Sequence, residues 1–370
     1  MTGVPGVPGV TDVTLPSRTE RNERRQRSRR AEAIVTMIIV LVAGVYAWTR
    51  AGVATVVART PPGPHPSTVR VTRDAAELAV LSITGGSGPM ILVVGRADGP
   101  VAISFPQRLT QVVPGMGEVD METFAQLDGA TVRVGVSNTL GVWVRHFAVA
   151  SAQSIAQAVR KAGGLTMDLG RGFIAHGTTI GPGVVTLTGA QVTAYLTGPQ
   201  GTAASRWGAF STALLTERLP LSPAALVDTD DAVAVSRLLA AAHGARPTAL
   251  PVTSVGGLVQ APDLSAIDTL ARASLASRDA PVPVLVQNGN GVPGVGADVA
   301  ARLIPAGFRV VLSTNAQSFS LQRTAIVALG SDWAGVAKRA RRALGVGAIT
   351  VSSVPSGVGD VKIIVGKDFK

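Results

Sequence analysis

A stretch without charge near the start of the chain limits its possible folds more than any other feature. No charged residue occurs between Ala33 and Trp48, and a second apolar run, AGVATVVA, follows Arg50. A membrane-spanning helix needs about 20 mostly apolar residues, and the long side chain of Arg50 can reach the interface. Tyr46 and Trp48 lie where an aromatic belt is expected. We therefore predict a membrane anchor at residues 31–58.

The charges before this stretch set its orientation. Residues 1–30 hold seven arginines and three acidic residues, and positively charged flanks stay on the cytoplasmic side. We therefore expect this basic tail in the cytoplasm, on anionic lipid, and the chain after about residue 58 outside. A cleaved signal peptide is the alternative, because VVA at residues 56–58 resembles a cleavage site, although the basic region is long for one. A buried helix of a soluble domain rarely carries so many arginines at one end.

Composition excludes several classes of function. The chain has no cysteine, which excludes disulfides, thiolate nucleophiles and cysteine-ligated metals. Its four histidines are scattered, so no histidine metal cluster is expected. An exported protein without disulfides is typical of a bacterial envelope. The net charge of +11 has a local source in the basic tail, and the membrane accounts for that tail without nucleic acid.

Short strands and helices alternate after the anchor, and they predict an α/β fold. Residues 59–70 are a Pro-rich spacer, residues 251–280 a linker, and residues 71–250 and 281–370 two α/β domains. In the first domain we predict strands at LAVLSIT, MILVVG, PVAISF, TVRVGVS, HFAVAS and LTMDL. Its helices are expected at AQSIAQAVRKAG, SRWGAFSTALLTERL and DDAVAVSRLLAAAHG.

The stretch NGNGVPGVGADVAARL raises the question of a nucleotide site. Gly289, Gly291 and Gly294 match the pattern G-x-G-x-x-G between a strand and a helix. However, the next strand, FRVVLSTN, ends without the acidic residue that would bind a ribose, and no P-loop lysine follows. We interpret the stretch as a structural turn from strand to helix, with a polymer or peptide along that edge as the alternative.

Residues Val282–Phe369 resemble the LytR C-terminal domain of bacterial envelope proteins. The resemblance rests on a strand, an Asn-Gly-x-Gly-x-x-Gly turn and an Ala-rich helix that ends in AGF. Two later strands, TAIVALG and DVKIIVGKDF, also resemble those that close that domain. The resemblance implies a small α/β domain in the cell envelope.

The preceding domain resembles the LytR–CpsA–Psr (LCP) family over about Ala76–Leu215. AISFPQRLTQVVPG is similar to the family strand that contains SIPRD, and LTGAQVTAYL to the stretch before its arginine-rich active-site segment. LGVWVRHFAVASAQSIAQAVRKAGGLTMDL resembles a family segment of strand, helix and Gly-Gly turn. Family members have a cytoplasmic tail, one span and an extracytoplasmic catalytic domain. They transfer a polyprenyl-pyrophosphate-linked glycopolymer to the cell wall.

The positions that carry the family's chemistry differ in this chain. Family members hold a divalent metal with acidic residues and the pyrophosphate with arginines, which neutralise charge on the phosphoryl oxygens. Their Arg-Asp pair is Gln107-Arg108 here, their Asp-Thr is Gly88-Pro89, and only Arg206 remains of the arginine-rich segment. The resemblance therefore implies a degenerate domain without catalytic residues or metal ligands. Arg108 and Arg206 are its candidate pyrophosphate-binding residues.

Other charged groups have a functional and a structural interpretation. Asp120 and Glu122 are spaced like a pair of carboxylates, and His146 is a possible base, but solvated or structural roles are commoner for such residues. The sequence KRARRALG at residues 338–345 predicts a basic helix face. That face is either an ordinary charged surface or a contact with anionic wall polymer.

The leading hypothesis is a membrane-anchored, extracytoplasmic cell-envelope protein without catalytic activity and without a cofactor. It would act as an accessory or scaffold that binds wall polymer, a lipid-linked precursor or a partner enzyme, with a prenyl chain held among aliphatic core elements. The alternative is an active LCP phosphotransferase that attaches glycopolymer to peptidoglycan with Mg²⁺ or Mn²⁺. A transcriptional attenuator ranks last, because the sequence has no recognisable DNA-binding fold, and no nucleic-acid partner is expected.

Overall fold

The computed structural model describes most of the chain after residue 75. The predicted tail, anchor and spacer lie outside the described residues. Among the helices that are described, none is both long enough and apolar enough to cross a membrane. Side chains of residues 203–206 are not described. The described residues are 76–85, 90–97, 99–198, 203–217, 219, 221, 225–256, 259–275, 277, 279–354 and 357–370.

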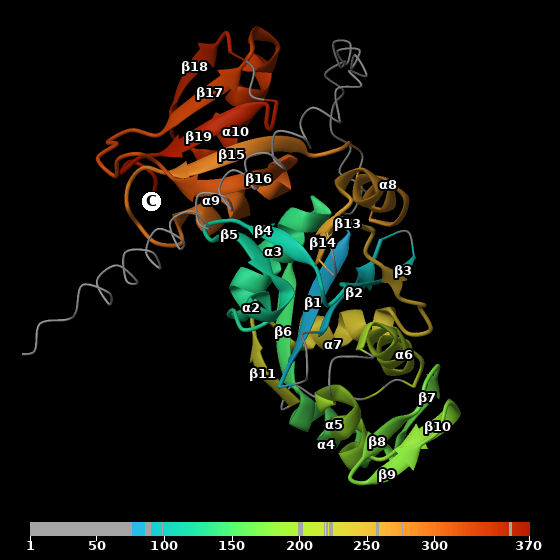
Figure 1. Ribbon diagram of the computed structural model, residues 1–370. Helices are drawn as coiled ribbons and strands as arrows, with labels where there is room; N and C mark the ends of the chain where they lie inside the picture. The colour runs from blue at the N-terminus through green and yellow to red at the C-terminus, as the bar shows by residue number, and fades with distance from the viewer. Residues whose placement is uncertain are drawn as a thin grey trace, which may run out of the picture. The chain divides into compact units, whose positions relative to one another are not determined.

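A six-stranded sheet is the centre of the region before residue 250 (Figure 1). Its strands are β1 (Glu77–Thr84), β2 (Met90–Arg96), β3 (Pro100–Ser104), β6 (His146–Ser151), β11 (Leu226–Thr229) and β12 (Thr248–Ala249). The strand order is β11-β6-β1-β2-β3-β12. β1 pairs with β2 antiparallel and with β6 parallel. β1 and β2 are buried on both faces, which explains their unbroken apolar sequences.

Two hydrophobic cores cover the two faces of this sheet, because alternate residues of a strand point to opposite sides. Ala79 and Leu81 lie in one core, and Val80 between them lies in the other. The first core contains residues of α4 (Ala152–Ala162), α5 (Gly189–Thr197), α6 (Ala203–Thr216) and α7 (Ala232–Ala241). The second contains residues of α2 (Met121–Phe124), α3 (Gly129–Leu140) and α8 (Leu264–Ser274).

Four two-stranded ladders complete this region. The strands β7 to β10 are grouped together beside α5 (Figure 1). The ladders pair β4 (Thr110–Val113) with β5 (Gly117–Asp120), β7 (Leu165–Leu169) with β10 (Gly183–Leu187), β8 (Phe173–Ala175) with β9 (Thr178–Ile180), and β13 (Val252–Gly256) with β14 (Val259–Pro262).

The predicted strand TVRVGVS is wrong, because these residues form part of α3. The carboxylate of Asp128 caps the start of the helix, and Gly141, at a φ of 67°, ends it. Val132 and Val136 lie in the core of the six-stranded sheet, whereas Val134 lies in the core of the C-terminal region. A helix that is buried on two sides has apolar residues all round, and its alternating valines therefore imitate a strand.

The C-terminal region is a five-stranded sheet with two helices, which agrees with the small α/β domain predicted from the sequence. Its strand order is β16-β15-β19-β17-β18. The strands are β15 (Val282–Asn288), β16 (Phe308–Asn315), β17 (Ala325–Leu329), β18 (Ala348–Ser352) and β19 (Val361–Val365). The helices are α9 (Val295–Leu303) and α10 (Ala334–Leu344), with the short 3₁₀ turns η3 (Ile304–Ala306) and η4 (Ser331–Trp333).

The glycine-rich stretch is a turn from β15 into α9, and its glycines have structural roles. The side-chain oxygen of Asn288 accepts the N–H groups of Asn290 and Gly291, at 3.2 and 2.9 Å. Gly291 and Gly294 have φ values of 80° and 79°, which residues other than glycine rarely adopt. A Cβ atom on Gly289 would lie 2.8 Å from a main-chain oxygen of β19. Local geometry therefore explains these glycines without a nucleotide.

A buried arginine joins the C-terminal sheet to the helices of the first region. Arg309 of β16 is only 4% exposed. Its guanidinium donates to the carbonyl oxygens of Asn138 and Thr139, at 3.1 and 3.2 Å. It also pairs with the carboxylate of Asp268 on α8, at 2.7 Å. A cation at the C-terminal end of α3 stabilises carbonyl groups that have no partner within the helix.

Two further contacts hold the same junction. The carboxamide of Asn138 donates to the carbonyl oxygen of Val310 and accepts its N–H, both at 2.8 Å. The N–H of Gly115 donates to the hydroxyl of Ser313 at 2.8 Å. A Cβ atom on Gly296 would lie only 2.5 Å from the nitrogen of Gly115. Hydrogen bonds of buried polar groups and the close approach of two backbones therefore both fix the junction.

The predicted linker, residues 251–280, contains β13, β14 and α8. Ile267, Ala271 and Leu275 are buried in the core of the six-stranded sheet, and Asp268 on the same helix pairs with Arg309. Residues Thr72–Lys370 accordingly form one compact unit.

The buried pair predicts an unequal response to charge removal. Asp268→Asn leaves the Arg309 guanidinium without its counter-charge in a buried place, and we expect the free energy of unfolding to fall by about 3 kcal/mol. Arg237→Gln is the matched control, because Arg237 and Glu77 form an exposed ion pair, which typically contributes less than about 1 kcal/mol. Urea unfolding of the full chain measures both. Similar losses in the two variants would contradict this account of the junction.

Candidate binding pocket

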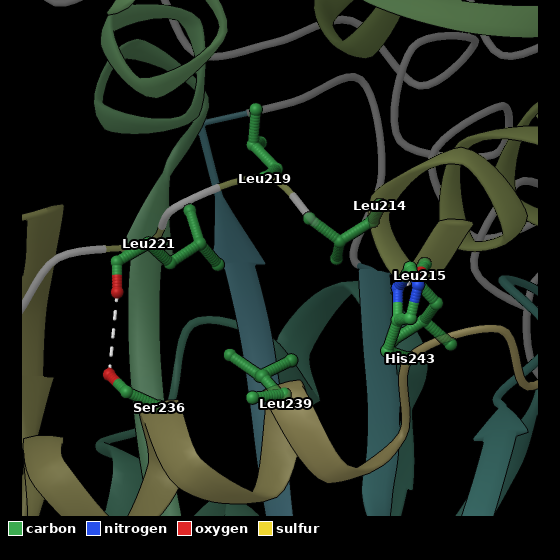
Figure 2. Close-up of a pocket in the computed structure, with 8 residues that line it drawn as sticks. Leu214, Leu215, Leu219, Leu221, Ser236, Leu239 and His243 are labelled. Carbon is green, nitrogen blue, oxygen red and sulfur yellow. Dashed lines mark hydrogen bonds between the residues drawn. The ribbon is translucent and has the colours of Figure 1, made fainter. Parts of the chain in front are cut away.

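An apolar pocket of about 410 Å³ lies beside the six-stranded sheet, between the end of α6 and α7. Figure 2 shows the side chains of Leu219, Leu221 and Leu239 turned toward the same space. The volume is within the usual range of small-ligand pockets. The lining residues are Leu214, Leu215, Leu219, Leu221, Ser236, Leu239, Ala240 and His243.

Both polar side chains of the pocket bond to the main chain. The hydroxyl of Ser236 donates to the carbonyl oxygen of Leu221 at 3.3 Å (Figure 2). The Nδ1 atom of His243 lies 2.8 Å from the carbonyl oxygen of Leu215, so that nitrogen carries the proton in this contact. These bonds tie the chain after α6 to α7 and hold the wall in shape. Among the described residues, the lining therefore offers aliphatic surface and no charged carboxylate or guanidinium group.

Helix α7 supplies three of the eight lining residues, and a charged cap holds its start. The carboxylate of Asp231 accepts the N–H groups of Ala234 and Val233, at 2.9 and 3.1 Å. The bond from Ala234 does most to hold the pKa of Asp231 below its ordinary value of 3.8. The bond from Val233 and the charges of His146 and Arg237 act in the same direction, although desolvation opposes them. Because the lowered pKa favours the ionised folded form, this stabilisation is present above pH 3.8 and lost as pH falls through the lowered pKa.

The sheet edge where the resembled family carries its chemistry is only partly described. The end of β1 meets the end of β6, with Thr84 opposite Ser151, and Ile83 of β1 pairs with Met90 at the start of β2. Gly88 and Pro89, which stand where the family has Asp-Thr, lie outside the described residues.

The structure places the two predicted pyrophosphate-binding residues on different elements. Arg108 is exposed in the turn after β3, and its carbonyl oxygen accepts the N–H of Gln260 at 3.0 Å. Beside it, the buried side-chain nitrogen of Gln107 has no hydrogen-bond partner. Arg206 lies in the first turn of α6, and its side chain is outside the description. A shared anion site of Arg108 and Arg206 stays a prediction.

The other candidate residues have structural partners. Asp120 caps α2 by accepting the N–H of Thr123 at 2.8 Å. The Nδ1 atom of His146 lies 3.7 Å from the carboxylate of Asp230, which also pairs with Arg133 at 3.0 Å. Within the described part of the chain, no group of three or more histidine and acidic side chains is arranged to hold a metal ion.

A family model matches the C-terminal part of the chain. Residues 281–369 match the model described as LytR cell envelope-related transcriptional attenuator. The LytR C-terminal domain predicted from the sequence is therefore confirmed over these residues. A comparison with curated protein sequences finds no match.

Several solved structures resemble the chain in its arrangement of strands and helices. TagV of Bacillus subtilis is 11% identical, with 55% of this chain and 96% of that chain covered and a TM-score of 0.43. A LytR-Csp2A-Psr enzyme from Actinomyces oris is 18% identical, with coverages of 54% and 90% and a TM-score of 0.42. The LytR-CPS2A-psr family protein YwtF (TagT) of Bacillus subtilis, with bound octaprenyl pyrophosphate lipid, is 12% identical, with coverages of 56% and 95% and a TM-score of 0.44. At such values these structures say nothing about the activity of this chain.

The sequence contains a signal for the pocket that residue-by-residue reasoning overlooks. A prenyl-binding pocket is expected from the aliphatic core, but its residues are not predicted. Leu214, Leu215, Leu219 and Leu221 fall within eight positions around the end of α6. Leucines at the end of a helix that continue into the following connector indicate an apolar surface. The helix and the connector form this surface together.

A substitution that fills the pocket is expected to weaken the binding of an apolar ligand. Leu239→Trp places a large ring in the cavity, and we expect the affinity for farnesol to fall at least about tenfold, because the ligand loses buried apolar contact. Val233→Trp is the matched control, since Val233 is exposed on the same helix and does not line the pocket. Calorimetric titration of the full chain in detergent measures both. Equal affinities for farnesol in the two variants would place its binding elsewhere.

Proposed function

We propose that this protein is a membrane-anchored, extracytoplasmic accessory of cell-envelope assembly that holds the lipid part of a polyprenyl-linked precursor without transferring it. The apolar pocket carries the proposal. Its wall is aliphatic, and its two polar side chains already bond to the main chain. Such a cavity suits a branched hydrocarbon chain.

The LytR C-terminal domain and the sequence resemblance support the choice of ligand. The matched family is described as cell envelope-related. The LCP-like motifs of the first region resemble proteins that act on polyprenyl-pyrophosphate-linked polymers, whereas Arg108 and Gly88 stand where that family has acidic residues. The proposed ligand is therefore of the class that the resembled family uses, a polyprenyl-linked precursor, but the transfer reaction of that family is not proposed. Membrane anchoring at residues 31–58 and an envelope partner enzyme belong to the same proposal.

The alternative is an active phosphotransferase. Residues 86–89, which follow β1 in the chain, and the side chain of Arg206 lie outside the described residues. In that case Arg108 and Arg206 would bind the pyrophosphate, and a divalent metal would need ligands beyond the described set.

Binding and turnover must be measured together to separate these two functions. The full chain in detergent is incubated with a polyprenyl-pyrophosphate-linked substrate and a peptidoglycan acceptor, with Mg²⁺ or Mn²⁺. We expect binding without a phosphate-linked product. We also expect binding to weaken in Leu239→Trp and not in Val233→Trp, because only the former fills the pocket.

Two outcomes would overturn the proposal. Product formation that EDTA abolishes, and that Arg108→Gln or Arg206→Gln reduces, would establish the phosphotransferase instead. Absence of binding by the folded wild-type chain would remove the precursor as a ligand.

A further inference from the structure

The C-terminal domain has a strongly basic helix. Residues 281–370 contain ten lysines and arginines but only four acidic residues. Lys338, Arg341 and Arg342 of α10 are all exposed, and a spacing of three or four residues places them on one side of a helix. None of the ion pairs found among the described residues includes any of the three. Among the described residues, no carboxylate therefore lies within ion-pair distance of these three cations.

A fourth cation extends this surface at the end of α10. The guanidinium of Arg302, on α9, donates to the carbonyl oxygen of Leu344 at 2.9 Å. It also stacks over the ring of Phe369, 4.4 Å from the centroid. These contacts hold Arg302 at the C-terminal end of α10, the helix whose last turn contains Arg341 and Arg342. We call Arg302, Lys338, Arg341 and Arg342 the basic face.

The fold holds the basic face rigidly toward solvent. The opposite side of α10 is buried in the core of the five-stranded sheet through Ala337, Ala340 and Leu344. Exposed Gly335 and Gly345 flank the cations along the helix, so no bulky side chain there shields them. A favourable effect on the helix dipole explains cations in the last turn, but Lys338 lies earlier in the helix.

The chemistry of the basic face favours a phosphate polymer over a membrane surface. A helix that lies in a bilayer inserts its apolar side among the lipids, whereas the apolar side of α10 is already buried. Three of the four cations are arginines, whose guanidinium groups bind phosphate oxygens in pairs. Lys338 and Arg342 are about 6 Å apart along the helix axis, at about 1.5 Å per residue, so successive charges of one extended strand can meet both.

We propose that the basic face is a binding site for an extended polymer with phosphodiester charges along its backbone. This deepens the proposed function, because it assigns the polymer partner to the C-terminal domain and leaves the lipid to the pocket. The two sites lie on different elements and can be tested separately.

Binding of long-chain inorganic polyphosphate to the full chain in detergent tests the proposal. In the triple variant Lys338→Gln, Arg341→Gln and Arg342→Gln, we expect the affinity to fall at least about tenfold. The slope of log affinity against log salt should fall in magnitude by about 2, since each phosphate contact on a single-stranded polyanion adds about 0.7. Fluorescence anisotropy at several salt concentrations measures both. The basic tail is present in every variant and contributes equally.

The matched control removes the same charge elsewhere. Arg160→Gln, Lys161→Gln and Arg171→Gln neutralise three exposed cations, two of them in the last turn of α4, and should leave polyphosphate binding unchanged. Equal losses in the two triple variants would reduce the effect to net charge and overturn the proposal. Unchanged binding in the basic-face variant would also overturn it.

Two further measurements separate the possible ligands. Loss of binding to phosphatidylglycerol vesicles with unchanged polyphosphate binding would make the basic face a membrane contact instead. Farnesol binding should be unaffected by the basic-face variant, and polyphosphate binding should be unaffected by Leu239→Trp. Failure of the pocket as a lipid site would therefore be distinguishable from failure of the basic face.

Discussion

The buried guanidinium of Arg309 constrains the rest of the structure. Removing a charge from water is unfavourable unless partners replace the water, and here two carbonyl oxygens of α3 and the carboxylate of Asp268 replace it. Those partners come from two helices of the first region, whereas the arginine comes from the C-terminal sheet. Separating the two parts would expose the carbonyl groups and break the ion pair. The LytR C-terminal domain thus forms one compact unit with the first region.

Helix α3 lies at the same junction and packs against both parts of the structure. It contacts the six-stranded sheet through Val132 and Val136 and the C-terminal core through Val134. Asn138 then uses its carboxamide as a neighbouring strand would use its main chain, by exchanging two hydrogen bonds with Val310. A helix end therefore takes the place of a further strand beside β16.

Much of the fold can be predicted from the sequence, but contacts between distant residues cannot. Strands such as MILVVG and the turn at Asn288–Gly294 are encoded by neighbouring residues, so local patterns identify them. TVRVGVS misleads because burial on two sides comes from tertiary structure, which overrides a local pattern. The pocket forms where α6, the segment after it and α7 meet in space. The leucines in the sequence therefore indicate an apolar surface but do not predict the shape of the pocket. Arg108 and Arg206 were predicted from a resemblance alone, and their partnership still depends on side chains outside the description.

The contact between Gly115 and Gly296 has a consequence for how such proteins can be recombined. The backbone of Gly115 occupies the space that a side chain on Gly296 would need, and a Cβ atom on Gly115 would lie 3.1 Å from the nitrogen of Ala297. A change on one side therefore requires an adjustment on the other. A chimera that received its C-terminal domain from a relative would dock only if the donor also had a residue without a side chain at this position. Exchange between homologues is therefore restricted by one steric match, and the two halves are expected to be inherited together.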